Sequence, residues 1–142
     1  LRTTGNLPVG AANAAIKVAP FQEDLFSGSL KYDGGTDRIY VRATGIYNIQ
    51  WSAQFQNTDT ALHDSYMWLR MGGADIVGST IISSIPNSHG GVPGHTLTSC
   101  NYYLNIPANT YLELYFAADS TQVSLQAYAA TAFCPSAAAG SQ

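Results

Sequence analysis

The segment from residue 45 to residue 56, GIYNIQWSAQFQ, constrains the fold of this chain more than any other stretch. From residue 47 onward its odd positions are apolar or aromatic, and from residue 48 onward its even positions are polar. Side chains of a β-strand alternate between two faces, so this pattern buries one face and leaves the other in water. A helix would mix the two kinds of side chain on every face. The segment is therefore predicted to be one long strand.

Shorter segments of the same kind follow one another along the chain, separated by turn residues such as Asp33-Gly34-Gly35 and Pro107-Ala108-Asn109. No apolar pattern predicts a helix of three turns. The sequence predicts an all-β fold, an antiparallel β-sandwich of seven to nine strands, as one domain over residues 1–142. Within it, residues 1–13 are expected to form an extended N-terminal arm and residues 135–142 a loose tail. The closing strand is expected over residues 123–129.

The composition predicts that the protein associates with copies of itself. Charged residues make up only 11% of the chain, against about 25% in an ordinary soluble domain. Residues 65–71, SYMWLRM, place large side chains on both faces of a strand, which suits a subunit interface. Aromatic residues favour strands and interfaces, although they also serve as platforms for sugars. We expect an interface that contains Tyr66, Trp68, Tyr103 and Tyr115.

Several classes of partner and activity are not expected. The net charge is −3, with only six lysines and arginines, which argues against nucleic acid. No apolar run approaches the roughly 20 residues that span a membrane. The sequence contains no Gly-x-Ser-x-Gly elbow, HExxH zinc motif, phosphate-binding loop or dinucleotide-binding glycine pattern. We expect a protein that is not an enzyme and has no cofactor.

The loop of residues 86–94, PNSHGGVPG, is the expected site of partner contact, since long loops on a rigid sandwich often carry function. The contact residues expected there are Asn87, His89, Val92 and the neighbouring His95. A metal site formed by His89 and His95 is the alternative, but a separation of six residues has no special ligand geometry. Exposed loop histidines are the simpler interpretation.

Two other features have a simple and a more specific interpretation. Residues 33–37, DGGTD, suit a β-turn, and calcium binding by the two carboxylates is the alternative. Cys100 and Cys134 are not spaced like a metal or redox motif. Two half-buried thiols are the simpler interpretation. A disulfide between them would tie the last strand to the strand that carries Cys100.

Three segments together resemble the superfamily of tumour necrosis factor and the globular heads of complement proteins. They are GIYNIQWSAQ at residues 45–54, WLRMGG at residues 68–73 and IPANTYLEL at residues 106–114. In this chain Gly72 replaces the asparagine usual at the second turn, and residues 108–110 replace a glycine-containing turn. The amino-acid sequence of the first two segments resembles small structural proteins of tailed bacteriophages still more closely. The resemblance covers roughly residues 38–133.

This resemblance implies a jelly roll that assembles as a trimer on the outside of a larger particle, without catalysis. The leading hypothesis is a homotrimeric capsid decoration (cement) protein on the virion exterior, bound to the major capsid protein or another virion protein. The N-terminal arm would anchor it to the shell through Leu1, Arg2, Leu7 and Val9. The alternative is a receptor-binding knob of a tail or head fibre. A secreted cytokine-like or complement-like ligand is less favoured, because collagen repeats, glycosylation sequons and a secretion signal are missing.

Overall fold

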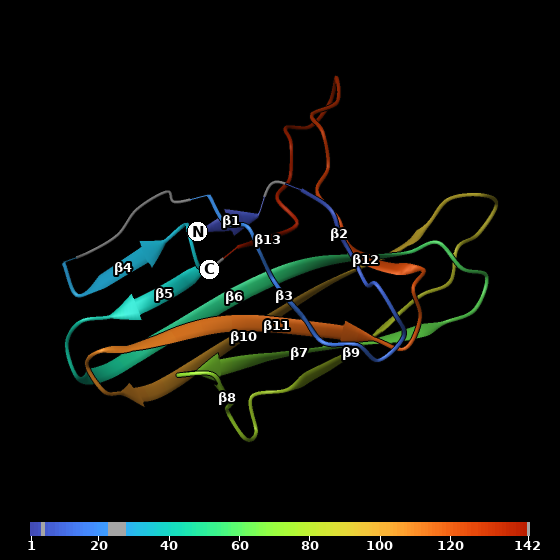
Figure 1. The fold of residues 1–142 in the computed structure, drawn as a ribbon. Helices are drawn as coiled ribbons and strands as arrows, with labels where there is room; N and C mark the ends of the chain where they lie inside the picture. The colour runs from blue at the N-terminus through green and yellow to red at the C-terminus, as the bar shows by residue number, and fades with distance from the viewer. Residues whose placement is uncertain (4, 23–27, 142) are drawn as a thin grey trace.

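The computed structural model describes residues 1–3, 5–22 and 28–141, and over these residues the protein is all-β. The thirteen strands form two antiparallel sheets that pack as a sandwich (Figure 1). The strands are β1 (Arg2–Thr3), β2 (Leu7–Pro8), β3 (Ile16–Lys17), β4 (Leu30–Asp33), β5 (Arg38–Val41), β6 (Gly45–Asn57), β7 (His63–Met71), β8 (Ala74–Asp75), β9 (Ile81–Ile85), β10 (Gly94–Ile106), β11 (Thr110–Ala118), β12 (Val123–Leu125) and β13 (Gly140–Ser141). The described part of the chain holds no helix that could cross a membrane.

The first sheet is built around β6, which pairs with β10 along its whole length of 13 residues. The other edge of β6 pairs with β12 and β13, and these pair in turn with β2 and β1. The second sheet is built around β11, which pairs with β7 on one edge and with β5 and β3 on the other. The chain passes from one sheet to the other between several consecutive strands, for example from β6 to β7, from β10 to β11 and from β11 to β12.

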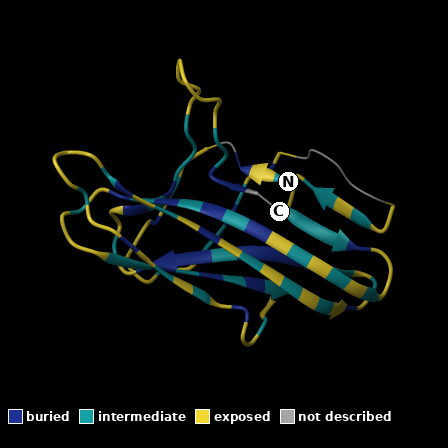
Figure 2. Ribbon diagram, turned by 180° about the vertical axis from the view of Figure 1, so that it is seen from behind, coloured by how far each residue is buried: buried dark blue, intermediate teal, exposed yellow. Residues whose placement is uncertain are grey.

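The core lies between the two sheets and confirms the alternation read from residues 45–56. Trp51, Ala53 and Phe55 on β6 are buried, and the residues between them are more exposed. Figure 2 shows this alternation as bands along the long strands. The ring of Phe55 meets that of Phe116 from β11 at a centroid distance of 5.9 Å. The apolar face of each sheet is thereby removed from water, which is the main driving force for a sandwich.

The structure corrects the prediction of an extended arm at residues 1–13. Within this segment β1 pairs with β13 and β2 pairs with β12. Val9 belongs to the core and is 3% exposed, and Leu1 and Leu7 pack against that core. Arg2 contributes its backbone to the pairing with Ser141. Backbone pairing along two short strands and the burial of two or three apolar side chains hold the segment on the sandwich.

The prediction of a loose tail at residues 135–142 is corrected in the same way, residue 142 lying outside the described residues. Ala139 is fully buried, and β13 lies between β6 and β1. A side chain at Gly140 would bring its Cβ to 3.3 Å from the carbonyl oxygen of Ser52, so the small residues of the tail allow this close pairing. The closing strand is shorter than expected, because β12 ends at Leu125.

Candidate binding surface

The outer face of the β11 sheet is charged, and a cluster of its charges is paired around Glu113. Glu113 on β11 is buried on this face, where its Oε1 accepts hydrogen bonds from Lys17 Nζ at 3.2 Å and from Arg38 Nε at 3.1 Å. The Arg38 guanidinium also lies 4.0 Å from the ring centre of Tyr111. These contacts satisfy a carboxylate that would otherwise be costly to bury. They hold β3, β5 and β11 together.

Three of the residues expected at a subunit interface lie on this same charged face. Tyr66 and Trp68 on β7 and Tyr115 on β11 are half-buried, and the rings of Trp68 and Tyr115 are 6.0 Å apart. Trp68 Nε1 donates to Asp75 at 2.7 Å. Tyr103 lies on β10 in the other sheet and is 71% exposed. The four residues therefore do not form one patch on one protomer, and the trimer interface stays a prediction.

The outer face of the β6–β10 pair has the opposite character. Neither strand contains an aspartate, glutamate, lysine or arginine. Beside β6, β10 pairs with no strand of the described residues, so its outer edge is open to backbone pairing. Strand β9 reaches this edge through side chains, with Thr98 Oγ1 donating to Ser83 Oγ at 2.7 Å. We call the exposed residues of this face other than His95 the neutral strip: Ile46, Asn48, Gln50, Leu97, Ser99, Asn101, Tyr103 and Asn105. A long, uncharged edge strand with apolar side chains beside it is a site where another chain can bind.

A projecting loop, residues 126–139 between β12 and β13, stands beside the neutral strip (Figure 1). Both of its ends are fixed to Gln54 on β6. The backbone of Gln54 bonds to Gln126 at 2.9 Å and to Ala139 at 2.8 Å, and its side chain donates to the carbonyl of Ala138 at 2.7 Å. Phe133 lies in the outer part of this loop and is 90% exposed. We call residues 126–139 the C-terminal loop.

The neck of the C-terminal loop is also fixed by hydrogen bonds. Tyr128 and Ala137 exchange backbone hydrogen bonds of 2.8 and 2.9 Å, and the backbone N–H of Thr131 donates to the carbonyl of Cys134 at 2.8 Å. The loop contains no charged residue. Alanine side chains dominate it, and Phe133 is its largest apolar group in water. In the sequence this loop carries only a weak signal, an aromatic residue followed by Cys-Pro within an alanine-rich segment.

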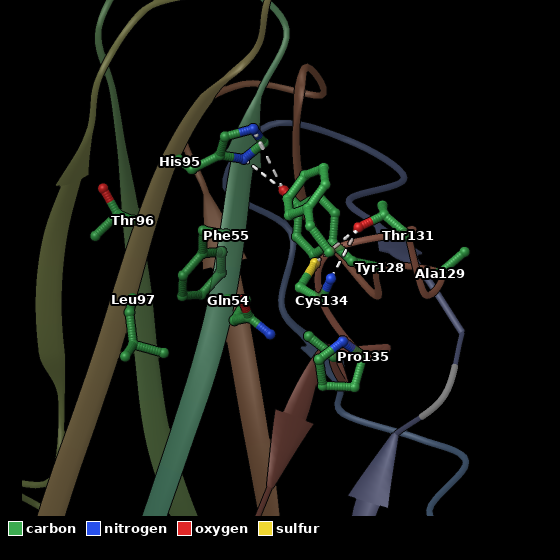
Figure 3. A pocket seen from close by; sticks show the side chains of 12 residues that line it. Gln54, Phe55, His95, Thr96, Leu97, Tyr128, Ala129, Thr131, Cys134 and Pro135 are labelled. Atoms are coloured by element: carbon green, nitrogen blue, oxygen red, sulfur yellow. Dashed lines mark hydrogen bonds between the residues drawn. The ribbon is translucent and has the colours of Figure 1, made fainter.

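Between the C-terminal loop and the start of β10 lies an open cleft of about 520 Å³. Figure 3 shows His95 and Leu97 on the side of β10 and Tyr128 on the side of the loop. The Tyr128 hydroxyl lies 2.5 Å from His95 Nδ1, and the two rings meet edge to face at 5.4 Å. Burial raises the pKa of the Tyr128 hydroxyl, so it stays protonated at neutral pH.

The cleft is lined by the His95 imidazole, the Tyr128 hydroxyl and the Cys134 thiol among apolar and amide groups. Its described lining residues include no carboxylate and no amine. The Cys134 thiol is exposed and lies 3.0 Å from the Thr131 hydroxyl, which cannot act as a base for it. Cys100 is half-buried, and both cysteines are free thiols in this structure. Apart from the imidazole and the thiol, the cleft presents aromatic, aliphatic, hydroxyl and amide groups.

The loop expected to contact a partner is a tight hairpin. His89 and Val92 exchange hydrogen bonds of 2.9 and 3.0 Å around Gly90 and Gly91, whose φ angles of 58° and 79° favour glycine. Asn87, His89 and Val92 are exposed there, whereas His95 belongs to β10 and contacts Tyr128 across the cleft. Within the described residues no group of three or more His, Cys, Asp or Glu could hold a metal ion.

At the same end of the sandwich, two carboxylates hold His63. Its Nε2 lies 2.9 Å from Asp59 and its Nδ1 lies 2.9 Å from Asp119. The hydrogen bond to Asp59 is the main cause of a raised pKa of the His63 imidazole. The neighbouring Asp64 instead accepts a hydrogen bond from Ser84 at 2.6 Å. This arrangement joins two turns of the fold and occupies both ring nitrogens.

The segment of residues 33–37 has the geometry of a β-turn. The Asp33 carboxylate accepts hydrogen bonds from the Thr36 hydroxyl at 2.7 Å and from the Gly35 N–H at 3.1 Å. These bonds, the one from Thr36 first, lower the pKa of Asp33. Asp37 accepts a hydrogen bond from the Tyr32 hydroxyl. Both carboxylates are thus used within the turn.

No protein-family model matches the sequence, and no curated protein matches it either.

Proposed function

We propose that this protein is a structural, non-enzymatic component of the exterior of a bacteriophage particle, where it decorates the head shell as a homotrimer. The observation that carries the proposal is the neutral strip beside the open edge of β10. Charged residues are depleted at the centre of protein interfaces, and this strip has none. The charged face on the other sheet provides the side that remains in water.

The order of the strands supports a jelly roll as the form of this sandwich. Long strands that follow one another in sequence lie in different sheets, which is typical of a jelly roll rather than a simple meander. The resemblance of residues 38–133 to tumour-necrosis-factor-like and phage structural proteins points the same way. A single domain of this kind can bind to the surface of a shell directly, without a fibrous stalk.

Two polar side chains, His63 and Cys134, have surroundings that support a protein without catalytic activity. His63 is bound by carboxylates on both ring nitrogens, and no described serine or cysteine is hydrogen-bonded to it. Cys134 has a hydroxyl neighbour instead of a base. Neither arrangement supplies the nucleophile–base pair that covalent catalysis requires.

We do not propose the N-terminal segment as the part of the protein that contacts the shell. Leu1, Leu7 and Val9 pack on the protein's own core, so they are not free to reach a neighbour. We propose that exposed surfaces of the folded domain, including the hairpin of residues 86–93, bind the major capsid protein or another virion protein. Neither nucleic acid nor a membrane is a proposed partner.

A receptor-binding knob of a tail or head fibre is the second candidate. The cleft of about 520 Å³ favours it, because concave surfaces with aromatic and amide groups suit small neutral ligands such as sugars. In this case the C-terminal loop and the hairpin of residues 86–93 would face away from the particle.

The number of copies of this chain per purified particle tests the proposal. Quantitative mass spectrometry against the major shell protein measures it directly. Hundreds of copies in a simple ratio to the shell protein would support decoration. A few to a few dozen copies would contradict decoration and favour the knob. Absence from particles would overturn both candidates.

A further inference from the structure

We propose that Phe133, in the C-terminal loop, docks onto the neutral strip of a second copy of this chain. The inference rests on the homo-oligomer of the proposed function and names the surfaces that form it. It concerns a contact between two different patches of the protein, the loop of one copy and the strip of the next.

The first argument is the position of Phe133. The side chain is 90% exposed, although burying a phenylalanine is strongly favourable. The loop that carries it is not free to fold back, because Gln54 fixes both of its ends and Tyr128 is paired with Ala137 at its neck. An aromatic side chain held in water by a fixed neck is arranged to meet another molecule.

The second argument is the character of the receiving surface. The neutral strip exposes Leu97 at 68% at one end and Tyr103 at 71% towards the other, where Ile46 of β6 is exposed in the neighbouring register position. Serine and amide side chains lie between these apolar groups, and they can donate and accept hydrogen bonds with loop backbone. The strip therefore offers apolar contacts for Phe133 together with polar partners for the peptide groups around it.

The third argument is the match in charge. The C-terminal loop has no charged residue, and neither has β6 or β10. Bringing the two surfaces together desolvates no ion and creates no like-charge contact. The alternative face, on the other sheet, carries Lys17, Arg38 and Arg70, so docking an alanine-rich loop there would remove water from ions.

The fourth argument concerns symmetry. Within one protomer Phe133 and Leu97 line the same open cleft of about 520 Å³, and both stay exposed, at 90% and 68%, so Phe133 does not cover its own strip. A contact between unlike patches joins copies head to tail, and such contacts close into rings when the rotation allows it. A ring of three copies is the form that agrees with the proposed homotrimer.

The test compares three substitutions to aspartate at exposed positions. Phe133→Asp alters the loop, Tyr103→Asp alters the strip, and Val77→Asp places the same charge at a residue that is 99% exposed between β8 and β9. We expect wild type and Val77→Asp to share one oligomeric mass by light scattering. We expect Phe133→Asp and Tyr103→Asp to associate about 100-fold more weakly, as for a charge placed in the centre of an interface.

Mixing the two defective variants tests whether the contact is head to tail. Each variant keeps one intact patch, so an equimolar mixture should form dimers through the single contact that remains possible. A mixture that stays monomeric would contradict the pairing of loop with strip. The Cys134 thiol gives an independent reading, since maleimide should label it more slowly in the wild-type assembly than in Phe133→Asp.

The outcomes separate this inference from the proposed function. A monomeric wild-type protein would overturn the homotrimer and, with it, this contact. An oligomeric wild type whose mass is unchanged by Phe133→Asp would overturn only the docking of Phe133 and leave the homotrimer standing.

Discussion

Gly94, the first residue of β10, lies directly against the backbone of the preceding loop. A Cβ at this position would be 1.9 Å from the carbonyl oxygen of Pro86 and 2.9 Å from that of Asn87. The Asn57 side chain donates to the same Pro86 carbonyl at 3.2 Å and holds it in place. No flexible side chain is available to move aside, so the position accepts only glycine.

We therefore expect Gly94→Ala to lower the free energy of unfolding by about 1–3 kcal/mol, the usual cost of forcing atoms into a packed site. Chemical denaturation followed by tryptophan fluorescence measures it. Gly10→Ala is the matched control, since nothing lies within 4 Å of a Cβ there. Equal stability of the two variants would contradict the close approach of Pro86.

His63 predicts a dependence of stability on pH. Its pKa is raised above the ordinary value of about 6.5, chiefly by the hydrogen bond to Asp59. A raised pKa in the folded state stabilises the protein fully below the unfolded pKa, and this contribution is lost as the pH rises through the folded pKa. The partner Asp59 has a lowered pKa, chiefly through His63, so its contribution is lost only in acid.

We expect His63→Gln to destabilise the protein most at about pH 5.5 and much less at about pH 9. Thermal unfolding at the two pH values measures the difference. His89→Gln, at an exposed histidine without an ion pair to a described residue, is the matched substitution. A loss of stability from His63→Gln that is the same at both pH values would show that the two carboxylates do not act on a charged imidazole.

Among the elements, the long strands could be predicted from the sequence and the short ones could not. Alternation over residues 45–56 predicts β6, because burial leaves a period-two pattern in any strand of sufficient length. Strands of two residues, such as β1, β2 and β13, are too short to carry such a pattern. They are formed by pairing with strands distant in sequence, which no local signal reveals.

The same limit explains how much of the candidate site could be predicted. The lack of charge in β6 and β10 is visible in the sequence, and so is the glycine turn at residues 90–91. The placement of Tyr103 on the opposite sheet from Trp68 depends on the sheet topology. The aromatic residues expected at one interface therefore lie on two different faces of the protomer. The C-terminal loop was missed because alanine-rich sequence predicts neither strand nor turn.

The N-terminal element makes a prediction that separates a docked segment from a free arm. Val9→Ala should lower the free energy of unfolding by about 2 kcal/mol, because Val9 is only 3% exposed and its methyl groups fill the core. Leu62→Ala, at an exposed leucine, should change it by less than about 0.5 kcal/mol. Denaturant titration of both variants measures this. A Val9→Ala protein as stable as wild type would restore the free arm.

At the scale of the whole molecule, the two outer faces differ in charge. One sheet carries the paired charges of Glu113, Lys17 and Arg38, and the other presents the neutral strip beside the open edge of β10. This division leaves β6 and β10 without a charged side chain on their outer face. It also predicts how the assembly responds to salt.

Association through the neutral strip should depend little on ionic strength. Between about 0.05 M and about 0.5 M NaCl we expect the dissociation constant to change by less than about threefold, because screening acts on charges and the contacting surfaces have none. Sedimentation at both salt concentrations measures it. A loss of association in high salt would instead indicate an interface on the charged sheet.

The most direct test of self-assembly on this strip is the absolute molar mass of the purified wild-type protein in solution. Light scattering across a range of concentrations should give three times the 15.1 kDa of one chain. A mass of one chain at every concentration would contradict the homotrimer and leave the neutral strip as a surface for a different protein.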